Sequence, residues 1–383
     1  MKRAIVLAGG GSKGAYQIGA WKALRELNIT FDIVTGTSIG AVNGAMIVQD
    51  DFEKAYEFWE KLSMDQVINN GLNINNGLET LRQQKEQIVP FIKVFMSNKG
   101  ADIQPFKDGL DEYLDEKRFM ESEIAFGLMT VKFPNMMPVE ITKTKIKPGY
   151  LQKWVLASAS CFPAFPICKI DEESYIDGGY YDNLPIDTAF RLGAEEVIAI
   201  SLKSPAPTKS YMGNPLVTII EPSHSLGGFL EFESEGIVNN MSLGYNDTMK
   251  TFGKLCGKLY SFRIVEKAAY EEIARKLIQT LLKMELGKSC KNDRWSLRNE
   301  KRLSGVDLIL GNDRQQDLFT CFIRFLENSM QLLQYDYYKI YNIEAVLEEL
   351  KAQEKSRVFH DRALECLCAR EFIKAINETV VEQ

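Results

Sequence analysis

Two short apolar runs near the N-terminus each end in a cluster of glycines and lead into a helical pattern. Residues 4–7 precede the glycines of 9–11, and residues 31–34 precede the glycine-flanked segment 36–40. Strands that alternate with helices favour a mostly parallel sheet, because each helix returns the chain to the starting end of the sheet. The chain is therefore predicted to have an α/β fold with a mostly parallel central sheet flanked by helices in three layers.

The same alternation continues through the first two-thirds of the chain. Further strands are predicted at 124–132, 139–142, 174–176, 196–201 and 216–220, and helices at 15–27, 41–48, 151–159, 185–192 and about 229–254.

The strand pattern fades from about Lys267. Helical spacing with many Leu, Glu and Lys residues follows at 268–286, 317–341 and 343–353, and the polar residues 287–311 are typical of a connecting loop. We therefore predict an α/β domain over 1–266 and a mainly helical region over 267–383.

Composition and charge exclude several classes of protein. The net charge of the 383-residue chain is -6, which argues against broad binding to nucleic acid. Seven cysteines without a CxxC pair are typical of reduced thiols and predict a cytoplasmic protein without a metal site. No apolar run is long enough to span a bilayer, although peripheral contact with a membrane and oligomer formation stay open.

The first glycine cluster fits two kinds of site. Gly9, Gly11 and Gly14 match G-x-G-x-x-G, which can bind a dinucleotide when an acidic residue closes the second strand. Asp32 opens that strand instead, which counts against a nucleotide cofactor. Alternatively, the amides of Gly10 and Gly11 could stabilise a developing negative charge at the start of the following helix.

The second glycine cluster is G-x-S-x-G, with Ser38 at its centre. Between a strand and a helix, this motif forms a sharp turn that holds a nucleophilic serine out of the sheet. Chance matches are common, but the predicted strand before Ser38 and the helix after it supply the context that the motif requires.

Three blocks of the chain resemble the patatin-like phospholipase family. They are GGGSKGAYQIGA, GTSIGAVNGA and Tyr175-Ile176-Asp177-Gly178-Gly179, in the order of the family. The resemblance covers about two-thirds of the chain and departs from the family's usual arginine at Lys13. It implies a Ser38–Asp177 dyad, an oxyanion hole at Gly9, Gly10 and Gly11, and supporting motif residues Lys13, Gly14, Gly36, Gly40, Gly178 and Gly179.

A serine needs a base to take its proton, and the chain contains two histidines. His360 lies outside the resemblance, whereas His224 follows a predicted strand and could complete a triad. The dyad with Asp177 is favoured, and the triad stays open. The nearby Asp182 is interpreted as a turn or helix-cap residue.

The predicted function is hydrolysis of a lipid acyl ester, of the phospholipase A or lysophospholipase type, without a cofactor. Two alternatives stay open: a soluble esterase or thioesterase with the same dyad, and a non-enzymatic lipid-binding module.

Overall fold

The computed structural model describes residues 1–68, 101–204, 210–211, 213–289, 317–353 and 364–378. The chain divides into two compact units, Met1–Thr248 and Met249–Gln383. The sequence places the boundary after residue 266, where the strand pattern fades. The units divide earlier because residues 255–263 contain two strands that belong to the second unit.

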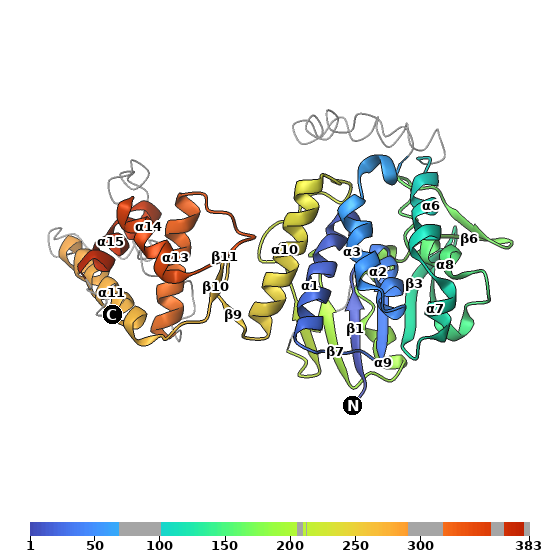
Figure 1. Ribbon diagram of the computed structural model, residues 1–383, viewed down its shortest axis with the longest axis horizontal. Coiled ribbons are helices and arrows are strands. Elements are labelled where there is room, and N and C mark those ends of the chain that lie inside the picture. Colours follow the sequence, from blue (N-terminus) through green and yellow to red (C-terminus); the bar gives the residue numbers. More distant parts are fainter. Residues whose placement is uncertain (69–100, 205–209, 212, 290–316, 354–363, 379–383) are drawn as a thin grey trace. The chain divides into compact units, whose positions relative to one another are not determined.

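The first unit contains a mixed sheet of eight strands in the order β5-β6-β3-β2-β1-β7-β8, with β4 paired to β3 (Figure 1). The strands are β1 Arg3–Leu7, β2 Ile33–Thr37, β3 Ala125–Phe133, β4 Met137–Thr142, β5 Cys168–Ile170, β6 Glu173–Asp177, β7 Glu196–Ile200 and β8 Val217–Ile220. The neighbouring strands in the series β3-β2-β1-β7-β8 pair in parallel, whereas β4 and β6 run antiparallel to β3. The predicted α/β class with a mostly parallel central sheet is confirmed.

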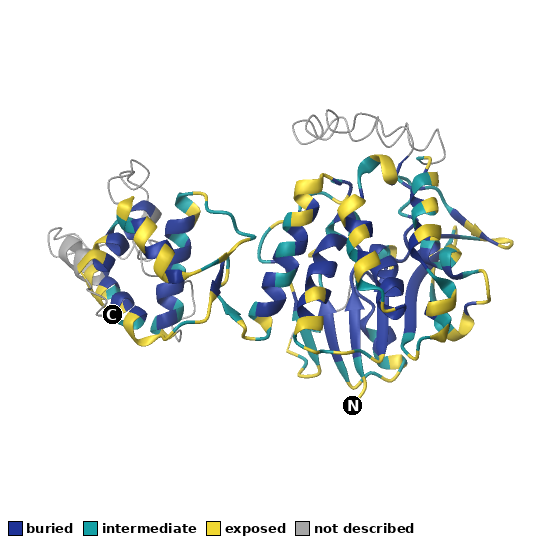
Figure 2. Cartoon of the chain, viewed as in Figure 1, coloured by how far each residue is buried: buried dark blue, intermediate teal, exposed yellow. Residues whose placement is uncertain are grey.

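Burial explains why the central strands are continuous apolar runs. Residues 4–7 of β1 are completely buried, as expected for a parallel strand covered on both faces (Figure 2). The helices of this unit are α1 Ala15–Glu26, α2 Ile39–Val48, α3 Phe52–Lys61, α6 Gln104–Tyr113, α7 Glu116–Glu121, α8 Leu151–Ser158 and α9 Ile186–Arg191, together with most of α10 Ser234–Thr251.

Two helices show that both faces of the sheet are covered. At Gly44 in α2, an added Cβ would lie 3.1 Å from Val34 and 3.2 Å from Phe126. Phe126 lies in β3, and the next residue of that strand is Gly127. An added Cβ at Gly127 would lie 2.8 Å from Thr188 in α9. Because successive side chains of a strand point to opposite faces, α2 and α9 pack on opposite sides of the sheet. The first unit therefore has the three layers that the sequence predicts.

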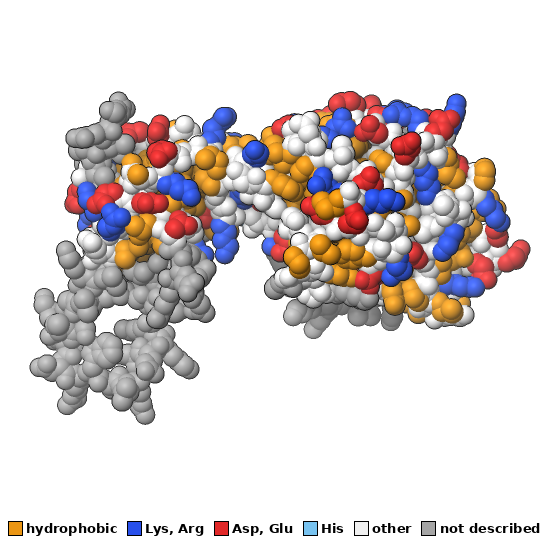
Figure 3. Space-filling model, turned by 90° about the horizontal axis from the view of Figure 1, so that it is seen from below, with side chains coloured by type: hydrophobic (Ala, Val, Ile, Leu, Met, Phe, Trp, Pro, Cys, Tyr) orange, Lys and Arg blue, Asp and Glu red, His pale blue; other side chains and the backbone are white. Residues whose placement is uncertain are grey.

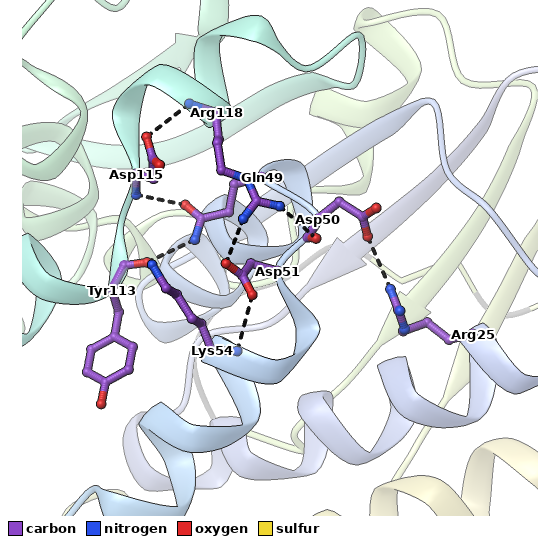
Figure 4. A network of polar contacts seen from close by, with 8 residues as sticks. All are labelled: Arg25, Gln49, Asp50, Asp51, Lys54, Tyr113, Asp115 and Arg118. Atoms are coloured by element: carbon purple, nitrogen blue, oxygen red, sulfur yellow. Dashed lines mark hydrogen bonds and ion pairs between the residues drawn. The ribbon is translucent and has the colours of Figure 1, made fainter.

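A polar network fixes α6 and α7 against the end of α2 (Figure 4). The buried Gln49 side chain donates to the carbonyl of Tyr113 at 2.9 Å and accepts from the amide of Asp115 at 3.0 Å. Arg118 in α7 donates to the carboxylate of Asp51 at 2.8 Å. The network satisfies backbone groups between the helices and holds α6, which forms one wall of the cavity described below.

The second unit is mainly helical, as predicted, and also contains a small sheet that the sequence does not predict. Its helices are α11 Ala268–Ser289, α13 Leu318–Leu332, α14 Ile343–Ala352 and α15 Leu364–Glu378, and its strands are β9 Leu255–Cys256, β10 Ser261–Arg263 and β11 Ile340–Tyr341. The helix expected over 317–341 stops at Leu332, because Gln334 adopts a positive φ of 58° and β11 follows. Of the expected loop over 287–311, residues 287–289 belong to α11 and the others lie outside the described residues.

A buried carboxylate joins helix and sheet within the second unit. Glu327 in α13 accepts hydrogen bonds from the amides of Lys258, Leu259 and Tyr260 at 2.6, 2.7 and 3.0 Å. Three amide donors partly replace the hydration that this carboxylate loses on burial.

The described surface mixes apolar and charged side chains. On the face in Figure 3, hydrophobic groups are interspersed with Lys, Arg, Asp and Glu. Within the described ranges, no helix combines the length and the apolar character that crossing a membrane requires.

Candidate active site

Ser38 occupies the sharp turn between β2 and α2. Its backbone has φ 58° and ψ -128°, a conformation that residues other than glycine rarely adopt. Close backbone contacts explain the flanking glycines. An added Cβ at Gly36 would lie 2.2 Å from the carbonyl oxygen of Gly40, and one at Gly40 would lie 2.3 Å from that of Leu7. The turn thus requires glycine on both sides of the serine.

Strand pairing brings Asp177 to this turn across 139 residues of sequence. Along β3, β2 pairs with 125–129, β6 pairs with 130–133, and β4 pairs with 127–132. Since β4 overlaps both of the others, β2 and β6 must share the opposite edge of β3. They run in opposite directions, so their carboxyl ends, at Thr37 and Asp177, meet where Met129 is followed by Thr130.

The side chains of Ser38 and Asp177 are in direct contact. Ser38 Oγ donates to Asp177 Oδ2 at 2.6 Å, and the amide of Gly179 donates to Oδ1 at 2.7 Å. Asp177 is 5% exposed. Burial raises the pKa of Asp177 to about 6, although the hydrogen bonds from Ser38 and Gly179 act in the opposite direction. The carboxylate is therefore more basic than an exposed aspartate.

The glycine loop after β1 lies beside the serine. Gly9, Gly10, Gly11 and Ser38 line the same cavity. The amide of Gly9 donates to the carbonyl of Asn183 at 3.1 Å, so it is engaged within the protein. Among the described residues, no acceptor is recorded for the amides of Gly10 and Gly11. These two N–H groups can therefore bind an oxyanion.

The other motif residues shape the surrounding backbone. An added Cβ at Gly14 would lie 2.7 Å from both Ile39 and Trp59, and one at Gly178 would lie 2.1 Å from the carbonyl oxygen of Met129. The half-buried Lys13 closes the loop through its amide, which donates to the carbonyl of Gly10 at 3.3 Å.

The cavity around Ser38 has a volume of about 370 Å³ and is mostly apolar. Its apolar wall consists of Ile39, Leu62, Val67, Phe106, Ala159, Phe165, Phe229, Leu230 and Phe232. Among the described residues that line it, Asp177 is the one charged side chain. Such a cavity suits a hydrocarbon chain whose polar end lies at Ser38.

Two of the rival residues, His224 and Asp182, do not line the cavity. His224 Nδ1 is 3.3 Å from Ser223 Oγ, and His224 is not among the residues that line the cavity. His360 lies outside the described residues. Asp182 accepts from the amide of Leu184 at 3.2 Å, so it is a turn residue as interpreted from the sequence. In the described part of the chain, no three His, Cys, Asp or Glu side chains are grouped to hold a metal ion.

Three buried polar residues next to the site are not predicted by the sequence reasoning. Ser158 Oγ accepts from the amide of Ser38 at 2.9 Å and donates to the carbonyl of Met129 at 2.7 Å. Gln17 donates to the carbonyl of Ala8 at 2.7 Å, and Asn183 contacts the glycine loop. Gln17 lies in the first block that carries the family resemblance, whereas Ser158 and Asn183 lie outside the three blocks. A lone small polar residue has no spacing that reveals its role.

Comparison with known proteins identifies the family of one domain of the chain. The model of the family described as patatin-like phospholipase matches residues 5–190, which include both Ser38 and Asp177. Residues 5–190 form a patatin-like phospholipase domain. This patatin-like domain also matches longer curated proteins. Patatin-like phospholipase domain-containing protein 7 of Mus musculus is 29% identical over 206 residues, 52% of this chain and 14% of that protein.

A second relative of the patatin-like domain is lysophospholipase nte1 of Aspergillus terreus, 30% identical over 207 residues, 52% of this chain and 12% of that protein. The chain thus spans a small part of either relative. Among solved structures, VipD from Legionella pneumophila is 13% identical with a TM-score of 0.43, over 100% of this chain and 92% of that chain. That likeness is too weak to bear on fold or function.

Proposed function

We propose that the chain is a serine lipid acyl hydrolase of the phospholipase A or lysophospholipase type, with Ser38 as nucleophile and Asp177 as base. The 2.6 Å contact between Ser38 Oγ and Asp177 Oδ2, at the end of an apolar cavity, carries this proposal. Membership of the patatin-like family and the lysophospholipase relative support the reaction class.

The reaction proceeds by acyl transfer. Ser38 Oγ attacks the ester carbonyl as its proton moves to Asp177, and the amides of Gly10 and Gly11 stabilise the oxyanion. The proton then passes to the leaving alkoxide as the ester bond breaks, which leaves an acyl-enzyme. Water, deprotonated by Asp177, then attacks the acyl carbon. The bond between Ser38 Oγ and that carbon breaks, the proton returns from Asp177 to Ser38 Oγ, and the fatty acid is released. A pKa of about 6 makes Asp177 a better proton acceptor near neutral pH than an ordinary aspartate.

The shape and lining of the cavity favour a lipid substrate. The apolar wall accommodates the acyl chain, and the head group stays outside, since the lining offers it no cationic partner among the described residues. Tyr180 and Phe229 line the cavity and, with Tyr181, are 43–53% exposed. Exposed aromatic side chains at a cavity rim suit the interface between water and lipid, which supports peripheral membrane contact during catalysis.

A serine-reactive fluorophosphonate tests the nucleophile. The wild-type protein should be labelled, and Ser38→Ala should lose both the label and hydrolysis while its circular dichroism spectrum stays unchanged. Ser204→Ala is the matched control, because Ser204 lines the same cavity, and it should keep the label. Label that persists on folded Ser38→Ala would move the nucleophile to another residue.

The substrate class is tested by comparing two kinds of ester. Product analysis on vesicles of mixed phospholipid, lysophospholipid and neutral glyceride should show release of fatty acid at a higher kcat/KM than on short monomeric esters. Activity confined to monomeric esters or thioesters would favour the soluble esterase or thioesterase instead.

A further inference from the structure

The glycine loop is attached to Asn183 by two hydrogen bonds. The amide of Gly9 donates to the backbone carbonyl of Asn183, and Asn183 Nδ2 donates to the carbonyl of Gly9, both at 3.1 Å. Asn183 is 6% exposed and lines the cavity. The first bond needs only the backbone of residue 183, whereas the second needs a side chain that donates.

The side-chain bond determines how the next peptide group is oriented. The C=O of Gly9 and the N–H of Gly10 belong to one planar trans peptide, so they point in nearly opposite directions. Because Asn183 Nδ2 holds the carbonyl of Gly9, the N–H of Gly10 must point away from the side chain of Asn183. No protein acceptor is recorded for this N–H among the described residues, so it remains available at the cavity.

The preceding peptide is fixed as well. Its C=O, from Ala8, accepts from Gln17 Nε2 at 2.7 Å, and its N–H is the Gly9 amide held by Asn183. Gln17 is itself held by Asn43, whose Nδ2 donates to Gln17 Oε1 at 2.8 Å. Hydrogen bonds thus fix two consecutive peptide groups, Ala8–Gly9 and Gly9–Gly10. The bond from Asn183 Nδ2 is the one that fixes the peptide with the candidate oxyanion donor.

Asn183 also lies on the turn that carries the base. An added Cβ at Gly179 would be 2.9 Å from Asn183 Oδ1 and 3.0 Å from Asp177 Oδ1. One turn, residues 177–183, therefore holds both the proton acceptor and the side chain that orients the oxyanion loop.

We propose that Asn183 is a positioning residue that sets the orientation of the Gly10 amide in the oxyanion hole. This inference rests on the proposed function. Without the Nδ2 donor, the Gly9–Gly10 peptide can rotate, and the donor moves away from the position of the oxyanion. Transition-state stabilisation then falls while the apolar cavity still binds the acyl chain.

Two variants and a neighbouring control test the role. Asn183→Leu nearly preserves volume and removes the donor, and Asn183→Ala removes it with less crowding. In both variants, the backbone carbonyl of residue 183 can still accept a hydrogen bond from the amide of Gly9. Asp182→Asn is the control on the same turn, because its amide oxygen can still accept from the backbone of Leu184.

We expect both variants of Asn183 to lower kcat about 10- to 100-fold with KM nearly unchanged, and Asp182→Asn to retain wild-type kcat. An alkyl trifluoromethyl ketone, which forms a tetrahedral oxyanion with the serine, should bind more weakly by a similar factor. An ether analogue of the substrate, which forms no oxyanion, should bind as before. A purely structural role would weaken both ligands or neither.

A substrate-free measurement separates this inference from the proposed function. In protein labelled with ¹⁵N-glycine, Asn183→Leu or Asn183→Ala should shift the Gly10 amide resonance, and Asp182→Asn should not. Folded Asn183 variants with an unchanged Gly10 resonance or an unchanged kcat would overturn the positioning role. If wild-type protein neither hydrolyses esters nor reacts with the fluorophosphonate, the proposed function fails, and the Gly10 resonance still decides the role of Asn183.

Discussion

Replacing Asp177 by asparagine should abolish acylation and yet make the protein more stable at neutral pH. Asparagine has nearly the same shape, and its Oδ1 can still accept from the amide of Gly179. Its Nδ2 can donate to the Ser38 hydroxyl but cannot take a proton. The substitution therefore removes the base and, in the same step, removes a buried negative charge.

The expected gain in the free energy of unfolding follows from the pKa of Asp177. Burial raises it from 3.8 to about 6, a shift of roughly two units, and each unit corresponds to about 1.36 kcal/mol. The folded state thus binds the proton more tightly than the unfolded state does. Well below pH 3.8 both states are protonated, and the carboxyl has no net effect on stability. As pH rises from about 4 to 6 the unfolded state ionises first, so folding becomes less favourable by up to about 3 kcal/mol.

The assay is urea unfolding of wild type and Asp177→Asn between pH 4 and 8, followed by tryptophan fluorescence. Three of the four tryptophans, Trp21, Trp59 and Trp154, lie in the first unit, so the signal mainly reports its unfolding. The variant should gain stability over wild type as pH rises to about 6 and then keep a constant advantage. Ser38→Ala should be inactive without this gain. A pH-independent difference, or an Asp177→Asn protein less stable at pH 7, would refute the reasoning.

The remaining predictions concern the glycine loop, the triad and the polar network. Gly11→Ala should lower kcat on short esters by about a hundredfold, because φ is +59° and the new Cβ would lie 2.0 Å from the carbonyl oxygen of Phe229. Gly10→Ala should lower kcat less than Gly11→Ala, since its closest contact would be the end of the Leu202 side chain at 2.9 Å and the next contacts lie at 3.4 and 3.5 Å. His224→Ala should keep most of the wild-type kcat, and a folded but inactive variant would favour the triad. Gln49→Leu should lower the free energy of unfolding by about 2 kcal/mol in urea titrations, because the buried carbonyl of Tyr113 and the partly buried amide of Asp115 lose their partners.

The sequence predicts seven of the eight strands of the large sheet, because they are apolar runs that alternate with helical patterns. It does not predict β5, which has three residues. It does not predict α3, although Asp51 caps this helix and Ala55, Phe58 and Trp59 form its buried face. The capping residue and the apolar spacing are both visible in the sequence, so α3 could have been predicted from local spacing alone. The strands β9 and β11, by contrast, have two residues each, too few for alternation to show.

The candidate nucleophile could be predicted because one local motif contains all the residues that shape its turn. The base could be proposed only through the family resemblance. Asp-Gly after a strand is also a common turn signal, and nothing local to Asp177 indicates Ser38. Asn183 could not be predicted in either way, since its role depends on which carbonyl of a distant loop lies within reach.

The meeting of Ser38 and Asp177 depends on a third segment, the end of α8, which contacts both. Ser158 Oγ accepts from the amide of Ser38, and the carbonyl of Ser160 accepts from the amide of Asp177, each at 2.9 Å. Ser158 also donates to the carbonyl of Met129 in β3. The two residues of the candidate dyad are therefore held from the sheet below and from one short segment beside them. Their separation is set by the hydrogen bonds that their own backbone amides donate, to Ser158 Oγ and to the carbonyl of Ser160, and the 2.6 Å contact between the side chains follows from that framework.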